Sequence, residues 1–259
     1  MKRRMAESAY SSPLLTAVFA ALFAVAAFSV SNVAAFGETA KFIIDISSRA
    51  LVVIFAAYAI KACGFKVFAK PNVGLMRGLL LFLGLLVCAN NFPIIGFITG
   101  NVALKENPQI FRYIVYCAAI GIAEEYVFRG FIMPLVGLKF KCKPHAPFIT
   151  VLVTSAIFSL CHLFNIFSAG IPATLLQVGY TFLTGGLFCA AYLFTENLLF
   201  PIALHVIFDL GGLIFGTPFG IAFGNMWDTA TIIITAVLGI IATAVYAFAV
   251  WNYKPRLKK

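Results

Sequence analysis

The chain has 259 residues, of which 62% are hydrophobic and 11% are charged, and its mean hydropathy is +1.01. This is too little polar surface to cover a water-soluble globule of that length, so we expect lipid to be part of the solvent. The formal net charge of +10 would indicate a nucleic-acid partner in a soluble protein, and its meaning here depends on where the charges lie.

Apolar segments of about 18 residues or more recur along the whole chain, and each is long enough to cross a hydrocarbon core of about 30 Å as a helix. In chain order we expect spans at about 14–36, 42–63, 75–99, 109–132, 147–167, 171–194, 198–216 and 228–251. The longest polar connection, 134–146, is too short to fold by itself. The sequence therefore predicts an all-α, polytopic membrane helix bundle of about eight transmembrane helices, in a single domain over residues 1–259.

Basic residues are concentrated at the chain ends and in alternate connections between the expected spans. They are Lys2, Arg3 and Arg4; Lys61, Lys66, Lys70 and Arg77; Lys139, Lys141 and Lys143; and Lys254, Arg256, Lys258 and Lys259. The positive-inside rule predicts this alternation for an even number of spans with both termini in the cytoplasm. We therefore expect a multi-pass protein of the cell membrane with lipid as a partner and no nucleic-acid partner.

Few ionisable residues lie within the expected spans. Those that we single out are Glu124, Glu125 and Arg129 in the fourth span, His162 in the fifth, and His205 and Asp209 in the seventh. Such residues are costly in hydrocarbon unless paired or hydrated, which makes them functional candidates. At 100° per residue, Glu124 and Glu125 point to different faces, whereas Glu125 and Arg129, four residues apart, can form an ion pair. We therefore expect Glu124 to be free for chemistry, while Glu125 is open to a structural role.

The buried carboxylates and imidazoles can support two kinds of chemistry. Imidazole exchanges protons near neutral pH, so glutamate and histidine together are suited to activating water. Glu124, His162, His205 and Asp209 also offer nitrogen and oxygen ligands for a divalent metal, with zinc the obvious candidate. Because the sequence has no H-E-x-x-H pattern, the metal stays an alternative to a carboxylate base.

Three short motifs contain these residues. The pattern E-E-x-x-x-R runs from Glu124 to Arg129, F-x-x-x-H from Phe158 to His162, and H-x-x-x-D from His205 to Asp209. In this order, and on separate spans, the motifs resemble those of the CPBP family of intramembrane proteases. That family includes the eukaryotic CAAX prenyl endopeptidase and many bacterial abortive-infection or bacteriocin-immunity homologues. The resemblance covers roughly residues 109–216, the expected protease-like core.

The resemblance implies roles for the motif residues. Glu124 and His162 would activate the hydrolytic water, and His205 and Asp209 would stabilise the oxyanion or help to bind a metal, with Glu125, Arg129 and Phe158 in support. The prenyl endopeptidase typically has asparagine where this chain has Asp209. An ionised carboxylate cannot donate a hydrogen bond to an oxyanion, so aspartate favours a metal ligand or a residue that orients histidine.

Helix geometry leaves one difficulty for this site. At about 1.5 Å per residue, Glu124 lies toward the cytoplasmic end of its expected span, whereas His162 lies about fifteen residues above the start of the next. The two can meet if the fifth helix begins outside the membrane, is strongly tilted, or is short and followed by a re-entrant turn near 168–170. We expect an extended cytoplasmic start of the fifth helix.

These observations together predict an intramembrane endopeptidase, with a metalloprotease implied by the resemblance. Its substrate would be a membrane-associated protein or peptide, prenylated or not, cleaved by water that glutamate and histidine activate. Two alternatives stay open at this point. A proton-coupled transporter also uses intramembrane acids and histidines, and would predict broken helices or repeated halves. A non-catalytic immunity or scaffold protein would retain the fold alone.

Overall fold

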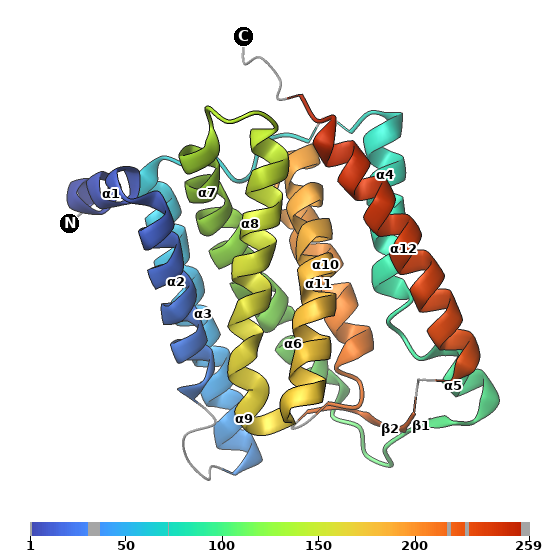
Figure 1. Ribbon diagram of the computed structural model, residues 1–259. Coiled ribbons are helices and arrows are strands. Elements are labelled where there is room, and N and C mark those ends of the chain that lie inside the picture. The colour runs from blue at the N-terminus through green and yellow to red at the C-terminus, as the bar shows by residue number, and fades with distance from the viewer. Residues whose placement is uncertain (1, 31–36, 72, 217–218, 226–227, 255–259) are drawn as a thin grey trace.

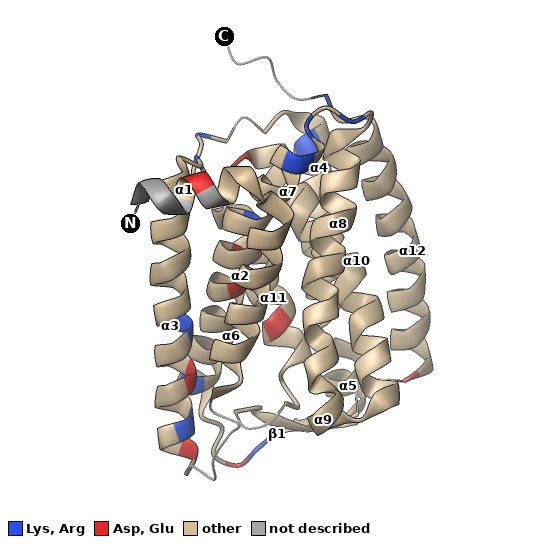
Figure 2. Cartoon of the chain, turned by 60° about the vertical axis from the view of Figure 1, so that its left-hand side comes forward, with Lys and Arg blue, Asp and Glu red and all other residues tan. Residues whose placement is uncertain are grey.

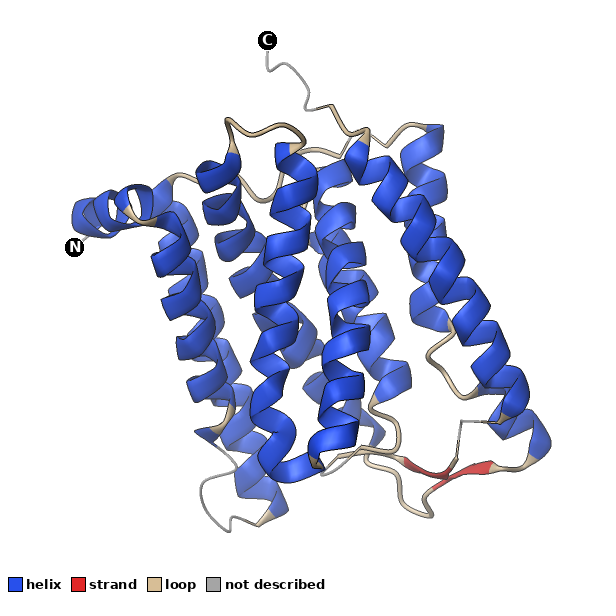
Figure 3. Ribbon diagram, viewed as in Figure 1, coloured by secondary structure: helices blue, strands red, loops and turns tan. Residues whose placement is uncertain are grey.

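The computed structural model describes residues 2–30, 37–71, 73–216, 219–225 and 228–254, and most of them are helical (Figures 1 and 3). The α-helices are α1 Lys2–Ser11, α2 Pro13–Phe28, α3 Glu38–Cys63, α4 Leu75–Ala89, α5 Ile94–Thr99, α6 Ile110–Glu125, α7 Met133–Phe140, α8 Ala146–Cys161, α9 Ile166–Ala169, α10 Ile171–Thr195, α11 Leu199–Gly212 and α12 Thr229–Trp251. A π-helix, Tyr126–Ile132, joins α6 to α7, and a 3₁₀-helix, His162–Asn165, joins α8 to α9. The long helices lie side by side in one bundle, and α1 lies across one end of it (Figure 1).

A short two-stranded antiparallel sheet lies at the opposite end of the bundle (Figure 3). Its strands are β1 Val102–Leu104 and β2 Ala222–Gly224, paired so that Val102 lies opposite Gly224 and Leu104 opposite Ala222. The sheet therefore joins the segment before α6 to the segment after α11, the two helices that carry most of the predicted site.

Four helical segments among the described residues are long and apolar enough to cross a membrane, judged by length and composition. They are α3, the stretch Ala146–Ala169, α10 and α12, whereas α2, α4 and α11 are apolar but shorter. A nearly all-helical protein of the membrane type is thus confirmed, while eight complete spans are not established. The expected first span extended to 36, but α2 ends at Phe28, and residues 31–36 lie outside the described residues.

The expectation of a single span over 75–99 is wrong. The helix α4 ends at Ala89, and the chain turns before the short helix α5. Pro93 disfavours helical geometry at the residue before it, and the two asparagines that precede the turn bond to other helices. Asn90 Nδ2 donates to Thr235 Oγ1 at 2.8 Å, and Asn91 Nδ2 donates to the Phe208 carbonyl at 2.8 Å. The break therefore has tertiary partners that one sequence does not reveal.

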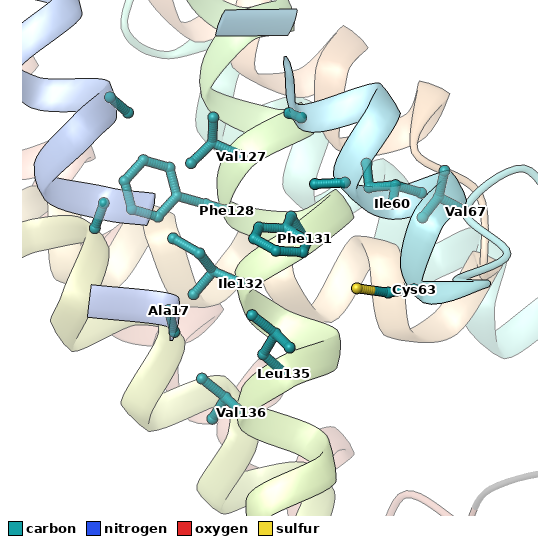
Figure 4. Packing of buried hydrophobic residues seen from close by; sticks show 14 of the residues in the cluster. Ala17, Ile60, Cys63, Val67, Val127, Phe128, Phe131, Ile132, Leu135 and Val136 are labelled. Carbon is teal, nitrogen blue, oxygen red and sulfur yellow. The ribbon is translucent and has the colours of Figure 1, made fainter. Parts of the chain in front are cut away.

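The helix that begins at Ile110 is longer than expected, because it continues through the π-helix and α7 to Phe140 instead of ending near 132. Its upper half packs into the larger hydrophobic core. In Figure 4, Val127, Phe128, Phe131, Ile132, Leu135 and Val136 of this helix lie close to Ala17 of α2 and to Ile60 and Cys63 of α3. This dry packing holds in place the segment that follows Glu124 and Glu125.

Candidate active site

A cavity of about 1340 Å³ lies inside the bundle. Residues of α6, α8, α10, α11 and α12 all contribute to its wall. The lining includes each residue that the sequence analysis proposed as catalytic, namely Glu124, His162, His205 and Asp209, together with Phe158. Side chains from three separate motifs therefore share one cavity within the bundle.

The helices α6 and α11 approach each other closely beside the acidic pair. Gly121 faces Val206, and a Cβ atom built on Gly121 would lie 2.8 Å from Val206 Cγ2 and 3.1 Å from its backbone nitrogen. Any larger residue at position 121 would push the helices apart. This close approach brings the carboxylates at the end of α6 within reach of His205.

His205 is buried between three carboxylates. Its Nδ1 lies 2.7 Å from Oε1 of Glu125, while its Nε2 lies 3.7 Å from both Oε2 of Glu124 and Oδ2 of Asp209. An ionised carboxylate only accepts hydrogen bonds, so we assign the Nδ1 hydrogen to the bond with Glu125. The two longer separations exceed hydrogen-bond length, which leaves Nε2 facing the cavity between Glu124 and Asp209.

The ion pair predicted from the spacing of Glu125 and Arg129 is confirmed. Arg129 Nη1 donates to Oε1 of Glu125 at 2.7 Å, and both side chains have no exposed surface. Arg129 Nη2 also donates to the Gly185 carbonyl at 3.0 Å. The guanidinium lies 4.5 Å from the ring centre of Phe158 and 5.3 Å from that of Phe188, a geometry typical of cation–π contacts. The pair therefore fixes Glu125 behind His205.

Asp209 does not make the hydrogen bond that orients His205, which was one of the two roles expected of it. The hydrogen bond that fixes the imidazole comes from Glu125, on the opposite side of the ring. Within the described residues, Oδ2 of Asp209 is buried without a hydrogen-bond partner. The ring of Phe188 stacks on His205, with centroids 4.7 Å apart and planes inclined by 23°. Asp209 is thus placed to interact with a group in the cavity that lies beside Nε2 of His205.

His162 and His205 both lie near the ring of Phe158. Nδ1 of His162 lies 3.1 Å from the Phe158 carbonyl, and a carbonyl oxygen only accepts, so the other ring nitrogen of the neutral imidazole is an acceptor. The Phe158 ring is nearly perpendicular to both imidazoles, with centroids 5.1 Å from His162 and 6.1 Å from His205. Among the described residues, no hydrogen bond joins His162 to Glu124. The two line the same cavity.

Glu124 and His162 lie at a similar depth in the bundle, but the reason differs from the one expected. The expected extension of the fifth helix is wrong, because α8 begins at Ala146, one residue from the expected 147. Instead the preceding helix continues to Phe140, sixteen residues beyond Glu124, and His162 lies sixteen residues beyond Ala146. At 1.5 Å per residue, both lie about 24 Å from the connection between α7 and α8. Glu124 and His162 therefore lie at a similar depth because the helix that contains Glu124 extends to Phe140.

The sequence analysis missed a second buried ion pair. Arg49 Nη1 lies 3.1 Å from Oδ1 of Asp45, both side chains are largely buried, and Arg49 lines the cavity. The spacing could have predicted this pair, because Asp45 and Arg49 are four residues apart within the expected span 42–63. Glu125 and Arg129 have the same spacing within the expected span 109–132. The cavity wall thus contains a cationic group from α3.

The four-residue metal set expected from the sequence is not assembled in this arrangement. In the described part of the chain, no three or more His, Cys, Asp or Glu side chains are placed to hold a metal ion. In that part of the chain no hydrogen bond or ion pair joins His162 to the other three residues, whereas Nε2 of His205 lies 3.7 Å from both Glu124 and Asp209. Metal binding therefore stays a prediction.

A membrane-type helix bundle with carboxylates and imidazoles on one cavity defines a membrane protein with a polar site among its helices. The family model described as Type II CAAX prenyl endopeptidase Rce1-like matches residues 106–211. All three motifs lie within this segment, so the match supports the CPBP and CAAX protease family that the motifs indicated. The comparisons with curated proteins and with solved structures gave no match.

Proposed function

We propose that the chain is an intramembrane endopeptidase that hydrolyses a peptide bond of a membrane-associated protein or peptide. The observation that carries the proposal is the placement of Glu124 and Asp209, each 3.7 Å from Nε2 of His205, in a cavity that His162 also lines. The family match over residues 106–211 supports a protease of the CAAX type. A CAAX-type substrate, prenylated or not, is accordingly the class that we propose.

In the proposed reaction, Glu124 is the general base. Its side chain is 17% exposed, so water in the cavity can reach it. A water molecule loses a proton to Glu124 while its oxygen bonds to the scissile carbonyl carbon, and Glu124 then returns the proton to the leaving nitrogen as the carbon–nitrogen bond breaks. His162, with an acceptor nitrogen, would orient the water by accepting its second hydrogen.

His205 is proposed to stabilise the oxyanion that forms when water attacks. A protonated Nε2 donates a hydrogen bond to the developing negative charge, and the bond from Nδ1 to Glu125 keeps the ring in position. The carboxylates of Glu124 and Asp209 flank Nε2 and balance the charge of the imidazolium. Because Arg129 neutralises Glu125, the imidazole is held without an unpaired buried charge behind it.

The orientation in the membrane is proposed from the distribution of charge. The described ends of the chain and the basic connection between α7 and α8 lie at the same end of the bundle (Figures 1 and 2). By the positive-inside rule this end faces the cytoplasm, which makes both termini cytoplasmic. Lipid surrounds the bundle, and the basic residues serve topology, so no nucleic-acid partner is proposed.

One observation favours a second candidate, a proton-coupled transporter. The break between α4 and α5 is the kind of interruption that transporters use at their binding sites, and Asn91 in that break lines the cavity. The carboxylates and imidazoles would then relay protons instead of activating water. Proton flux into liposomes containing the purified chain separates the two functions, because a peptidase needs no flux.

The test of the peptidase is substitution of Glu124. We expect Glu124→Gln to lower the rate of peptide cleavage in liposomes by at least about a hundredfold, the usual range for a lost general base. The matched control is Glu106→Gln, which changes an exposed glutamate that does not line the cavity and should keep the rate. Cleavage at the original rate by both folded Glu124→Gln and His162→Ala variants would end the proposal. Elemental analysis and activity with a chelator test the metal separately.

A further inference from the structure

A second, smaller cavity lies at the end of the bundle opposite the β-sheet. Its volume is about 430 Å³, and its wall combines the connection between α7 and α8 with the residues at the end of α12. Both segments lie at this end of the bundle in Figure 1. Three side chains in the wall carry or can carry a positive charge, namely Lys143, His145 and Lys254, and no carboxylate of the described residues lines it. The cavity therefore has an excess of positive charge.

Aromatic contacts hold the two segments of this wall together. The imidazole of His145 stacks on the indole of Trp251, with centroids 3.7 Å apart and planes inclined by 17°, and Phe148 meets the same indole edge-on at 5.2 Å. Nδ1 of His145 lies 3.4 Å from the Trp251 carbonyl. The backbone of His145 is left-handed, with φ of 52°, a conformation that a residue other than glycine keeps where its surroundings hold it. The stack therefore gives the cavity a fixed wall.

The two lysines of this cavity are not neutralised by the protein. In the described part of the chain, the side chains of Lys143 and Lys254 form no ion pair and no hydrogen bond. Like charges around one small cavity repel each other, and an anion between them removes that repulsion. A phosphate group is the anion that fits best, because it offers several acceptor oxygens to ammonium and imidazole donors at once.

The surroundings of the cavity favour a lipid as the source of the phosphate. The helix α12 is long and apolar enough to cross a membrane, and little of it is buried by the rest of the protein. Ile241, Val245 and Phe248 are exposed and spaced four and three residues apart, so they form an apolar stripe along α12. Asn252, four residues beyond Phe248 and near the same stripe, lines the cavity. Trp251 beside it is a residue type enriched at the level of lipid headgroups. The stripe therefore offers a path for an acyl chain that leads to the basic cavity.

We propose that this cavity binds the headgroup phosphate of an anionic phospholipid, with Lys143, His145 and Lys254 as its contacts. The site is separate from the cavity that Glu124 lines, and it is independent of peptidase activity. A lipid bound here connects the start of α8 to the end of α12. A ligand that binds the folded state alone raises the stability of that state, so the lipid stabilises the bundle.

Membrane topology is the ordinary explanation for basic residues at this end, and the chain offers a comparison that separates the two roles. Lys141 belongs to the same connection as Lys143 and is equally exposed, but it does not line the cavity. The two lysines are equivalent for topology and for general attraction to an anionic membrane surface. A binding site makes them different, because only Lys143 reaches the ligand.

The experiment uses the purified full chain in micelles of a neutral detergent. The sequence has two tryptophans, Trp227 and Trp251, so Trp227→Phe leaves the indole of the stack as the single tryptophan fluorophore. Phosphatidylglycerol is added to the micelles, and zwitterionic phosphatidylcholine is the comparison. We expect a saturable change in fluorescence at phosphatidylglycerol concentrations at least about tenfold below those that phosphatidylcholine requires. Lys143→Gln should weaken the affinity by about five- to tenfold, and Lys141→Gln, the matched control, by less than about twofold.

Three outcomes of this titration would overturn the site. Equal losses from Lys143→Gln and Lys141→Gln would leave only a general surface charge, and equal affinity for the two lipids would remove the need for an anion. Glycerol phosphate and a soluble acidic peptide are titrated in the same way. If either gives the change at the concentration that phosphatidylglycerol needs, the ligand is a soluble phosphate or a protein segment, and the lipid is refuted.

Thermal unfolding decides the case if the fluorescence of Trp251 does not respond. Phosphatidylglycerol should raise the unfolding midpoint of the unaltered chain and of Lys141→Gln. The double variant Lys143→Gln with Lys254→Gln should show less than about half of that shift. No shift in the unaltered chain, or the same shift in all three proteins, contradicts the proposal. Neither measurement involves peptide cleavage, so the lipid site stands or falls separately from the proposed peptidase.

Discussion

Removal of the cation from the fully buried ion pair is expected to be strongly destabilising. In the variant Arg129→Met, a side chain of similar length without charge replaces the arginine. The carboxylate of Glu125 then stays buried without its 2.7 Å partner, and the Gly185 carbonyl loses its 3.0 Å donor. Breaking one side of a buried pair costs about 3–5 kcal/mol, and an unsatisfied buried carbonyl adds about 1–3 kcal/mol. We expect a total loss of about 4–8 kcal/mol in the free energy of unfolding.

A double substitution isolates the interaction between the two charges. At an effective dielectric constant of about 20, charge centres about 4 Å apart attract each other by about 4 kcal/mol. In Glu125→Gln combined with Arg129→Met, both charges are absent, and the glutamine oxygen can still accept the hydrogen bond from His205. The double variant should therefore be about 2–4 kcal/mol more stable than the sum of the single losses predicts.

The free energies are measured by denaturant unfolding of the purified protein in mixed micelles, followed by tryptophan fluorescence. Arg112→Met is the control, a half-buried arginine whose loss should change the free energy by less than about 0.5 kcal/mol. The reasoning is refuted if the single losses add to within about 0.5 kcal/mol in the double variant, because the two charges would then not interact. It is also refuted if Arg129→Met unfolds with the free energy of the unaltered chain.

Three further outcomes can be checked with single substitutions. Glu124→Leu should abolish cleavage and leave the free energy of unfolding unchanged or higher, because Oε2 of Glu124 lies 3.7 Å from Nε2 of His205, beyond hydrogen-bond length; a clear loss of stability would argue for a structural role. Gly211→Ala should lower the free energy of unfolding by about 1–3 kcal/mol, because the added Cβ would lie 2.6 Å from the backbone of Asn91. Gly239→Ala, on the open side of α12, should be neutral or stabilising in the same unfolding assay. Hydrogen bonds from Thr231 hold the pKa of Asp228 below its usual range. The ionised Asp228 therefore stabilises the start of α12 at pH values above its usual pKa, and this stabilisation is lost as the pH falls through the lowered pKa. Amide exchange at the start of α12 should show this pH dependence in the unaltered chain and not in Asp228→Asn.

Spacing within one helix predicted the parts of the site that depend on one helix alone. The positions of Glu125 and Arg129, four residues apart, predicted their ion pair, and the structure confirms it. The same rule applied to Asp45 and Arg49 would have found the second pair. Helix periodicity therefore predicts an ion pair where two oppositely charged residues lie four apart in an expected span.

Contacts between helices could not be predicted from spacing. The sequence analysis left two roles open for Asp209, a metal ligand or a residue that orients histidine. The structure instead places Glu125 of the neighbouring helix at 2.7 Å from the imidazole. That distance depends on how closely α6 and α11 approach at Gly121, which is a property of the packed bundle. A single sequence contains no direct record of such an approach.

Hydropathy also misjudged where helices end. The segment 75–99 is apolar throughout, yet α4 ends at Ala89, because two asparagines find partners on α11 and α12. Conversely, the fourth helix continues past the expected boundary at 132, because buried side chains on either side of Gly130 pack against α2 and α3. Helix ends in this protein follow tertiary contacts more than the average polarity of a window.

The π-helix after Glu125 explains how one long helix can serve both the polar site and the dry core. In a π-helix the backbone bonds reach five residues instead of four, and such segments occur frequently at functional sites. Before it, Tyr116, Ile120 and Glu124 face the cavity; after it, Leu135 belongs to the hydrophobic core. A regular helix would keep one stripe on one face along its whole length. The change of winding between the two halves lets the acidic pair face α11 while the residues that follow pack against α2 and α3.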